Sequence, residues 1–258
     1  MATYANGTPS WVDLGSPDLD ASAAFYGDLF GWTTTEPGSV EETGGYRMFV
    51  KDGKTVAGLG PNQEGQPPVW TTYLAVDDAD KTAELAKGNG GTPFFEPMDV
   101  MDAGRMAIIA DPTGAVFGIW QAGQHTGAEL VNEPGSLTWN ELMTRDVESA
   151  KRFYSSVFGI VPTEFAMGEG APYVIFEVND RGVAGVLAMG DEFPPEMPSV
   201  WVTYFAVDDT DAAAKKATSL GATVSREPFD IPGVGRIAVL SGPAGEMFAI
   251  IKNAPQPA

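Results

Sequence analysis

The most constraining feature of this sequence is an internal repeat. Residues 11–14, Trp-Val-Asp-Leu, return as Trp-Asn-Glu-Leu at residues 139–142. In both places an aspartate follows the tryptophan, then a Phe-Tyr pair, then a Phe-Gly pair. Residues 69–73, Val-Trp-Thr-Thr-Tyr, match residues 200–204, Val-Trp-Val-Thr-Tyr, and Ala-Val-Asp-Asp follows each of them closely. Because the order and spacing of these matches persist along the chain, the protein consists of two tandem copies of one domain.

The boundary between the copies falls in residues 123–136. This stretch is polar, contains three glycines and a proline, and shows no hydrophobic period, which is typical of a linker. The sequence therefore predicts a first domain over residues 1–122, a second over residues 137–252, and a proline-rich tail over residues 253–258.

Each copy contains two similar modules. A strand over residues 11–15 leads to Asp18, which suits a helix N-cap, and an apolar helical period then ends at Gly31. Strands over residues 46–50 and 55–59 follow, joined by an Asp-Gly turn. The scheme then repeats within the first copy, with a strand over residues 69–76 and a helix that begins after Asp78. The second copy shows the same two modules. With one helix per βαβββ module, we expect an α+β fold in which each copy is a cupped mixed β-sheet with its helices outside.

Composition narrows the possible functions. The sequence has no cysteine and a single histidine, so thiolate chemistry is excluded and imidazole chemistry is restricted to His125. The net charge of −20 opposes binding to nucleic acids and to anionic membranes. The N-terminal residues show neither a basic region nor an apolar core, and no apolar run is long enough to span a bilayer, so we expect a cytoplasmic protein.

Together these motifs resemble a known superfamily. A strand, an aspartate followed by Phe-Tyr and Phe-Gly, a strand running into Val-Asp-Asp, and a Pro-x-Gly turn before the last strand are similar to the vicinal-oxygen-chelate (VOC) superfamily of glyoxalases, bleomycin-resistance proteins and extradiol dioxygenases. Residues 6–13, Asn-Gly-Thr-Pro-Ser-Trp-Val-Asp, further resemble its two-domain actinobacterial hydroxylase-like and glyoxalase-like branch, which includes accessory proteins of daunorubicin-type biosynthesis.

The resemblance implies metal ligands on the cup face of the first, fifth and eighth strands. The corresponding residues of this sequence are Trp11, Thr71 and Gly118 in the first copy, and Trp139, Val202 and Ala249 in the second. None of them is a usual donor to a divalent metal, so we expect no metal and no cofactor.

Two carboxylates nevertheless fall on the predicted cup face. Asp13 and Glu141 each lie two residues beyond the repeated tryptophan and share its side of the strand. Three interpretations remain open. Each carboxylate could bond to a neighbouring strand or to solvent, contact a ligand, or hold a weak, water-rich cation.

Strand alternation predicts which other residues face each cup. The opposite parity carries Val12, Leu14, Leu74, Val76, Phe117 and Ile119 in the first copy, which suits packing under helices. The predicted ligand-binding residues of the first copy are Trp11, Asp13, Tyr46, Met48, Thr71, Tyr73, Gly118 and Trp120. Those of the second copy are Trp139, Glu141, Tyr173, Val202, Tyr204 and Ala249, with Met143 on the same face.

These side chains favour a pocket for a planar aromatic molecule. Tryptophan and tyrosine faces stack on flat ligands, and an acidic residue beside tryptophan favours a cationic group. The alternative is that the aromatic residues contact one another and fill the cup. Arg105 and Arg236 recur after glycine and could bind an anionic group of a ligand, or could pair with acids such as Asp99 and Asp230. His125 is interpreted as an ordinary linker residue.

Three functional hypotheses follow. The first is a metal-independent binding or accessory protein for a small aromatic molecule in antibiotic biosynthesis or resistance. The second is a glyoxalase-like lyase or a hydroxylase or dioxygenase with a non-standard site, in which Asp13, Glu141, Glu177 or tyrosines replace the lost triad. The third is a structural scaffold with filled cups. We expect a monomer in which the two copies form an internal pseudo-dimer, and catalytic residues cannot be assigned.

Overall fold

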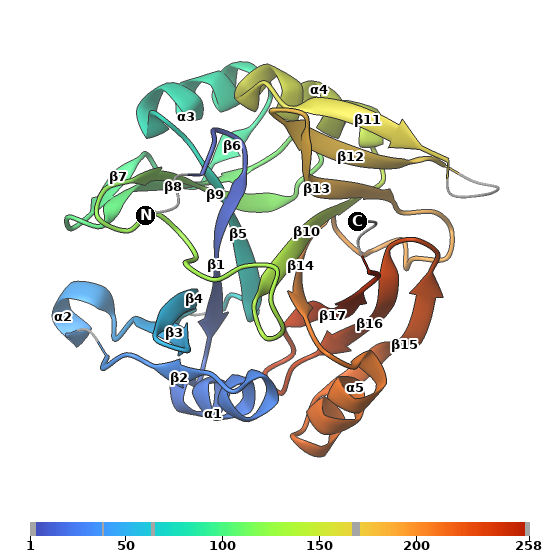
Figure 1. Ribbon diagram of the computed structural model, residues 1–258. Helices are drawn as coiled ribbons and strands as arrows, with labels where there is room; N and C mark the ends of the chain where they lie inside the picture. The colour runs from blue at the N-terminus through green and yellow to red at the C-terminus, as the bar shows by residue number, and fades with distance from the viewer. Residues whose placement is uncertain (1–3, 38, 63–64, 167–170, 256–258) are drawn as a thin grey trace. The chain divides into compact units, whose positions relative to one another are not determined.

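The computed structural model describes residues 4–37, 39–62, 65–166 and 171–255 (Figure 1). The elements of the first copy are β1 (Pro9–Ser16), α1 (Leu19–Phe30), β2 (Thr33–Thr34), α2 (Val40–Thr43), β3 (Arg47–Lys51), β4 (Lys54–Pro61), β5 (Val69–Ala75), α3 (Ala79–Gly88), β6 (Thr92–Pro93), β7 (Met98–Val100), β8 (Gly104–Ala110) and β9 (Val116–Ala122). Those of the second are β10 (Leu137–Thr144), α4 (Val147–Phe158), β11 (Val161–Phe165), β12 (Tyr173–Val178), β13 (Arg181–Ala188), β14 (Val200–Ala206), α5 (Thr210–Ser219), β15 (Thr223–Ile231), β16 (Gly235–Ser241) and β17 (Met247–Asn253).

Helices α1 and α4 begin and end where the sequence predicts. The Asp18 carboxylate accepts a 2.9 Å hydrogen bond from the amide of Ala21, and Asp146 accepts one of 2.9 Å from Ser149. Gly31 and Gly159 end these helices in the left-handed conformation, with φ of 75° and 73°. These contacts satisfy backbone groups that the helix itself leaves unpaired. Short α2 lacks a hydrophobic period and was not expected.

Each copy forms a mixed sheet. The strand order is β2-β3-β4-β1-β5-β9-β8-β6, with β7 paired to β8, in the first copy, and β11-β12-β13-β10-β14-β17-β16-β15 in the second. Strands β1 and β4 are parallel, as are β5 and β9, whereas the hairpins are antiparallel. The α+β fold and the tandem repeat are confirmed.

The compact units of the chain cut across the two copies. Unit 1 contains Met1–Trp11, Thr71–Gly127 and Trp139–Val202, and unit 2 contains Val12–Trp70, Ala128–Thr138 and Thr203–Ala258. Unit 1 thus joins the second module of the first copy to the first module of the second copy, and α3 packs against α4. In unit 2, α1 packs against α5. The boundaries inferred from the repeat, residues 1–122, 123–136 and 137–252, stay a prediction.

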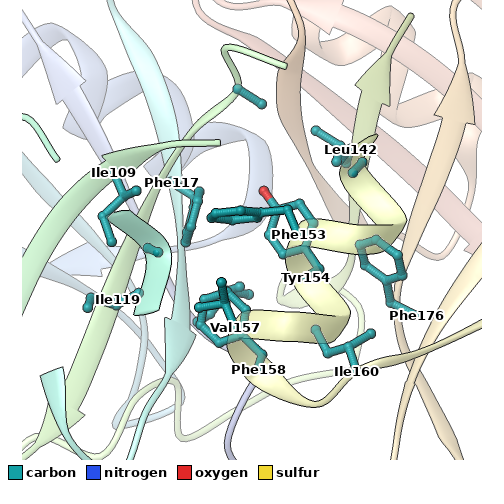
Figure 2. Packing of buried hydrophobic residues seen from close by; sticks show 14 of the residues in the cluster. Ile109, Phe117, Ile119, Leu142, Phe153, Tyr154, Val157, Phe158, Ile160 and Phe176 are labelled. Atoms are coloured by element: carbon teal, nitrogen blue, oxygen red, sulfur yellow. The ribbon is translucent and has the colours of Figure 1, made fainter. Parts of the chain in front are cut away.

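Each unit has its own hydrophobic core between helices and strands. In unit 1, Phe117 and Ile119 of β9 meet Phe153, Tyr154 and other residues of α4 (Figure 2). In unit 2 the core includes Val12, Leu14, Phe205, Phe248 and Ile250. The residues that alternation placed under the helices therefore do lie there. No helix among the described residues is long and apolar enough to cross a membrane.

Candidate ligand-binding face

None of the predicted ligand-binding residues is exposed. They lie on the strands that the prediction named, with Tyr46 just before β3. Trp11, Tyr73, Trp120, Glu141, Val202, Tyr204 and Ala249 are buried, as is Gly118. Asp13, Tyr46, Met48, Thr71, Trp139 and Tyr173 are half-buried. None of them belongs to either helix-packed core, which agrees with their opposite strand parity.

In unit 1 the structure brings three of these residues into one hydrogen-bonded group. The Tyr173 hydroxyl donates a 2.8 Å hydrogen bond to Oε1 of Glu141 and accepts a 3.1 Å bond from the indole Nε1 of Trp139. Burial raises the pKa of the Tyr173 phenol far above its usual range, and the negative charge of Glu141 raises it further. Tyr173 therefore keeps its proton near neutral pH and acts as a donor rather than a base.

A glycine makes this contact possible. Gly185 of β13 pairs with Glu141 of β10 on one side and with Ile175 of β12 on the other. A Cβ at Gly185 would overlap the Tyr173 hydroxyl and would lie 2.9 Å from Nε1 of Trp139. The tyrosine thus crosses β13 over bare backbone to reach Glu141, two strands away from its own.

The first copy repeats this arrangement with weaker geometry. In unit 2, the Tyr46 hydroxyl lies 3.4 Å from Oδ2 of Asp13, across Gly58 of β4. Aspartate is one methylene shorter than glutamate, which accounts for the longer separation. Of the interpretations left open for the two carboxylates, hydrogen bonding within the sheet is therefore observed for both.

In unit 1, a histidine packs against the aromatic residues of the first copy. The His125 ring packs edge-on against Trp11 with centroids 4.3 Å apart, and against Trp120 at 5.7 Å. The backbone carbonyl of His125 accepts a 2.8 Å hydrogen bond from Nε1 of Trp120. Tyr73 covers Gly118, where a Cβ would overlap its ring. His125 lies after β9, in the segment that the sequence assigned to the linker, and its ring packs against these two tryptophans.

The sequence matches the Glyoxalase/Bleomycin resistance protein/Dioxygenase superfamily over residues 8–119 and again over residues 126–250. The chain belongs to this superfamily. The two matched segments together span nearly the whole chain, and they correspond to the two repeats.

Several relatives of this superfamily member align along almost their full length. CFP32 of Mycobacterium tuberculosis, whose glyoxylase assignment is provisional, is 44% identical over 98% of this chain and 97% of its own. The anthracycline biosynthesis protein DnrV of Streptomyces peucetius is 40% identical over 98% of this chain and 95% of its own.

Solved structures of the superfamily share the fold. A Mn(II)-bound glyoxalase from Novosphingobium aromaticivorans superposes with a TM-score of 0.67 and 17% identity, covering 96% of this chain and 82% of that one. The 2,3-dioxygenase LapB from Pseudomonas sp. KL28 superposes with a TM-score of 0.67 and 13% identity, covering 100% of this chain and 96% of that one. Identities this low establish the fold alone.

The superfamily's metal does not fit the residues present. The positions that the resemblance assigns to metal ligands carry indole, hydroxyl and aliphatic groups or only hydrogen, none of which is a usual donor to a divalent cation. The nearby Glu141 carboxylate accepts a hydrogen bond from Tyr173. Within residues 4–37, 39–62, 65–166 and 171–255, no three acidic or histidine side chains are grouped as a metal site would require.

The two repeated arginines are held by acids. Arg105 donates through Nε and Nη2 to Asp80 of α3, at 2.8 and 2.9 Å, and through Nη1 to Asp99 at 2.8 Å. Arg236 contacts Asp211 of α5 and Asp230 in the same way. The alternative that these arginines form ion pairs is confirmed. Asp80 and Asp211 are additional partners, because the first turns of α3 and α5 lie near the strands that carry the arginines.

A second buried polar group in each unit was missed by sequence reasoning. In unit 1, Nε1 of Trp201 donates to the Tyr154 hydroxyl at 2.9 Å, which donates to Oδ2 of Asp111 at 3.0 Å. In unit 2, Trp70, Tyr26 and Glu246 form the same chain at 2.9 and 2.8 Å. The recurrence of Trp and Tyr was visible in the sequence, but their acidic partners come from the other copy.

Proposed function

We propose that this protein is a metal-independent binding or accessory protein for a planar aromatic small molecule, preferably one that carries a positive charge. The observation that carries this proposal is the Trp139–Tyr173–Glu141 group at a face whose metal-ligand positions hold no suitable donors. A half-buried indole offers a stacking surface, and the adjacent carboxylate favours a cation.

The second copy is the better candidate for binding. In the first copy, Trp11 is only 3% exposed and its ring packs against His125. Trp139, its equivalent, is half-buried and holds its indole N–H toward Tyr173. A ligand that contacts the exposed part of Trp139 would meet an aromatic face beside a phenol and a carboxylate.

The relatives support a place in small-molecule metabolism. DnrV is named as an anthracycline biosynthesis protein, and anthracyclines are planar aromatic compounds. We therefore propose a role in the biosynthesis of, or resistance to, an aromatic polyketide-type compound. We further propose a cytoplasmic monomer. A net charge of −20 opposes anionic partners, so we expect it to bind neither nucleic acids nor anionic membranes.

Tryptophan fluorescence tests the proposal directly. An anthracycline added to the wild-type protein should quench part of the emission in a saturable manner. Trp139→Phe should abolish most of that quenching, whereas Trp11→Phe, at the closed equivalent position, should retain it. Saturable quenching that survives Trp139→Phe, or no quenching at all, would overturn the assignment of this face.

Metal analysis separates this proposal from the enzymatic alternative. Untagged protein purified without chelator should contain less than about a tenth of an equivalent of Mn, Fe, Ni or Zn. A metal content near one equivalent per copy would instead favour the enzymatic hypothesis, a glyoxalase-like lyase or an oxygenase. If no compound of a broad library raises the melting temperature, the scaffold alternative is favoured.

A further inference from the structure

A surface hollow of about 470 Å3 lies at the C-terminal end of α4, within unit 1. Its walls come from the segment before β1, the end of α4, the start of β11 and the turn between β12 and β13. The volume falls within the range of small-molecule sites. The hollow contains none of the residues of the ligand-binding face described above.

Apolar and acidic groups share the lining. Val161 and Val178 supply apolar surface, and Val161 is 58% exposed. The side chain of Phe158 is buried in the core of unit 1. Glu177 and Asp180 supply carboxylates, and neither forms an ion pair with any residue that the structure describes. The C-terminal end of α4 adds the partial negative charge of its last carbonyl groups. The electrostatic character of the hollow therefore favours a cation.

The first repeat shows what occupies the equivalent place. At the end of α1, Nζ of Lys51 donates a 3.1 Å hydrogen bond to the carbonyl of Phe30. Lys51 is the last residue before the turn of the β3–β4 hairpin, where it pairs with Lys54. In the β12–β13 hairpin, the corresponding residue is Val178, which pairs with Arg181. The second repeat thus lacks the ammonium group that the first repeat places at its helix end.

A neutral group partly replaces that ammonium. Nδ2 of Asn6 donates a 3.1 Å hydrogen bond to the carbonyl of Phe158, the counterpart of Phe30. This bond satisfies one lone pair of the carbonyl but brings no positive charge, and the carbonyl oxygen retains a second lone pair. Asn6 lines the hollow and does not fill it.

We propose that this hollow binds the ammonium group of a small organic amine, with its apolar body against Val161 and Val178. The ammonium group lies near Glu177, Asp180 and the α4 C-terminus, in the position that Lys51 fills in the first repeat. The ammonium group of the bound ligand thus takes the place that the Lys51 side chain occupies in the first repeat.

Nuclear magnetic resonance on the full chain tests the site. Benzylamine, which is cationic at pH 7, is titrated into 15N-labelled protein, and benzyl alcohol serves as the neutral probe of the same shape. Benzylamine should shift the amide signals of Gly159 and of Glu177 to Asp180 in a saturable manner. Benzyl alcohol should bind more weakly, by up to about fivefold, as the loss of a partly exposed charge pair predicts.

Three variants locate the binding. Val178→Lys restores the lysine of the first repeat and should abolish the shifts. Glu177→Gln should weaken binding about fivefold. Glu196→Gln removes one exposed charge outside the hollow and should leave the affinity unchanged.

The outcomes separate this site from the aromatic face. Shifts at Gly159 and Asp180 without tryptophan quenching support the hollow even if the anthracycline proposal fails. Equal binding of benzyl alcohol, full binding by Val178→Lys, or an equal loss in Glu196→Gln would each overturn the proposal. Shifts confined to residues around Glu141 would assign amine binding to the aromatic face instead.

Discussion

The hydroxyl group of Tyr173 lies over the backbone of Gly185, in space that any side chain at that position would occupy. The hydrogen bond from this hydroxyl to Glu141 therefore depends on a residue that takes no part in it. The same relation holds between Tyr46 and Gly58, and in both copies the glycine pairs directly with the acidic residue of the neighbouring strand.

Gly185→Ala should destabilise the protein. The new methyl group would force Tyr173 and Trp139 from their places, and overpacking of this kind costs about 1–3 kcal/mol. Gly88→Ala is the matched control, because a Cβ at this helical position meets no atom within 4 Å. Urea unfolding followed by circular dichroism should show a loss for the first variant and none for the second. Equal midpoints for the two variants would contradict the close approach.

Tyr173→Phe should cost more stability than Tyr46→Phe. The first substitution removes a 2.8 Å bond to Glu141 and the acceptor of the Trp139 indole, whereas the second removes a 3.4 Å contact to Asp13. A hydrogen bond to a charged group contributes about 1.5–3 kcal/mol and a long, poorly formed one contributes less. Paired urea titrations check the order, and a larger loss in Tyr46→Phe would refute it.

Tyr154→Phe should destabilise unit 1. It leaves the Trp201 indole N–H without its acceptor and Oδ2 of Asp111 without its donor, both in a buried environment. A buried polar group left unsatisfied costs about 1–3 kcal/mol. Tyr26→Phe makes the same change in unit 2, so the two losses should be similar. Thermal unfolding of both variants provides the comparison, and a melting temperature unchanged in either would show that the hydrogen bonds contribute nothing.

The stability of the protein should depend on Glu246 as pH changes. Burial raises the pKa of Glu246 above its ordinary value of 4.5, although the hydrogen bond from Tyr26 acts in the opposite direction. Because the folded protein then holds this proton more tightly than the unfolded chain, the contribution of Glu246 to stability is greatest below 4.5 and is lost as pH rises through the folded pKa.

Glu246→Gln should therefore flatten the decline of unfolding free energy as the pH rises above 4.5 toward neutral. Part of the decline should remain, because burial also raises the pKa of Asp111 in unit 1. Urea midpoints measured across this range for wild type, Glu246→Gln and the exposed control Glu196→Gln test the effect. If the variant and the wild type decline in parallel, Glu246 ionises freely in the folded protein.

Arg105→Gln should leave anthracycline binding unchanged. Its guanidinium group is occupied by Asp80 and Asp99, so it is not directed to a ligand. Glu141→Gln, which removes the carboxylate beside Trp139, should weaken the binding of a cationic anthracycline several-fold. Fluorescence titration of both variants gives the test, and a several-fold loss in Arg105→Gln would return that arginine to the binding face.

Much of the local structure could be predicted because its causes are local. Asp18 and Asp146 cap helices since their carboxylates reach amides three residues away, and Gly31 tolerates a φ of 75°. Asp52 and Gly53 form the β3–β4 turn with φ of 51° and 74°, as an Asp-Gly pair predicts. Strand alternation separated Val12 and Leu14, which enter the core, from Trp11 and Asp13, which do not.

Side-chain partners in the candidate site were harder to predict. Alternation placed Glu141 and Tyr173 on one face, yet their hydrogen bond depends on Gly185, which no local pattern singles out. His125 reaches Trp11 from 114 positions along the chain, the difference between the two residue numbers. A hydrophobic period shows which side of a strand a residue occupies, but not which residue lies across from it.

The sequence by itself determined that this protein is two copies of a βαβββ pair, where α1 and α4 begin and end, and which strand faces are apolar. Only the tertiary structure decided that the helices pair between copies, α3 with α4 and α1 with α5, so that Tyr26 meets Glu246 and Tyr154 meets Asp111. The reason is that an apolar face lowers its free energy by burial against any complementary face. The choice among such faces rests on shape and on a few buried hydrogen bonds that form only when distant segments meet.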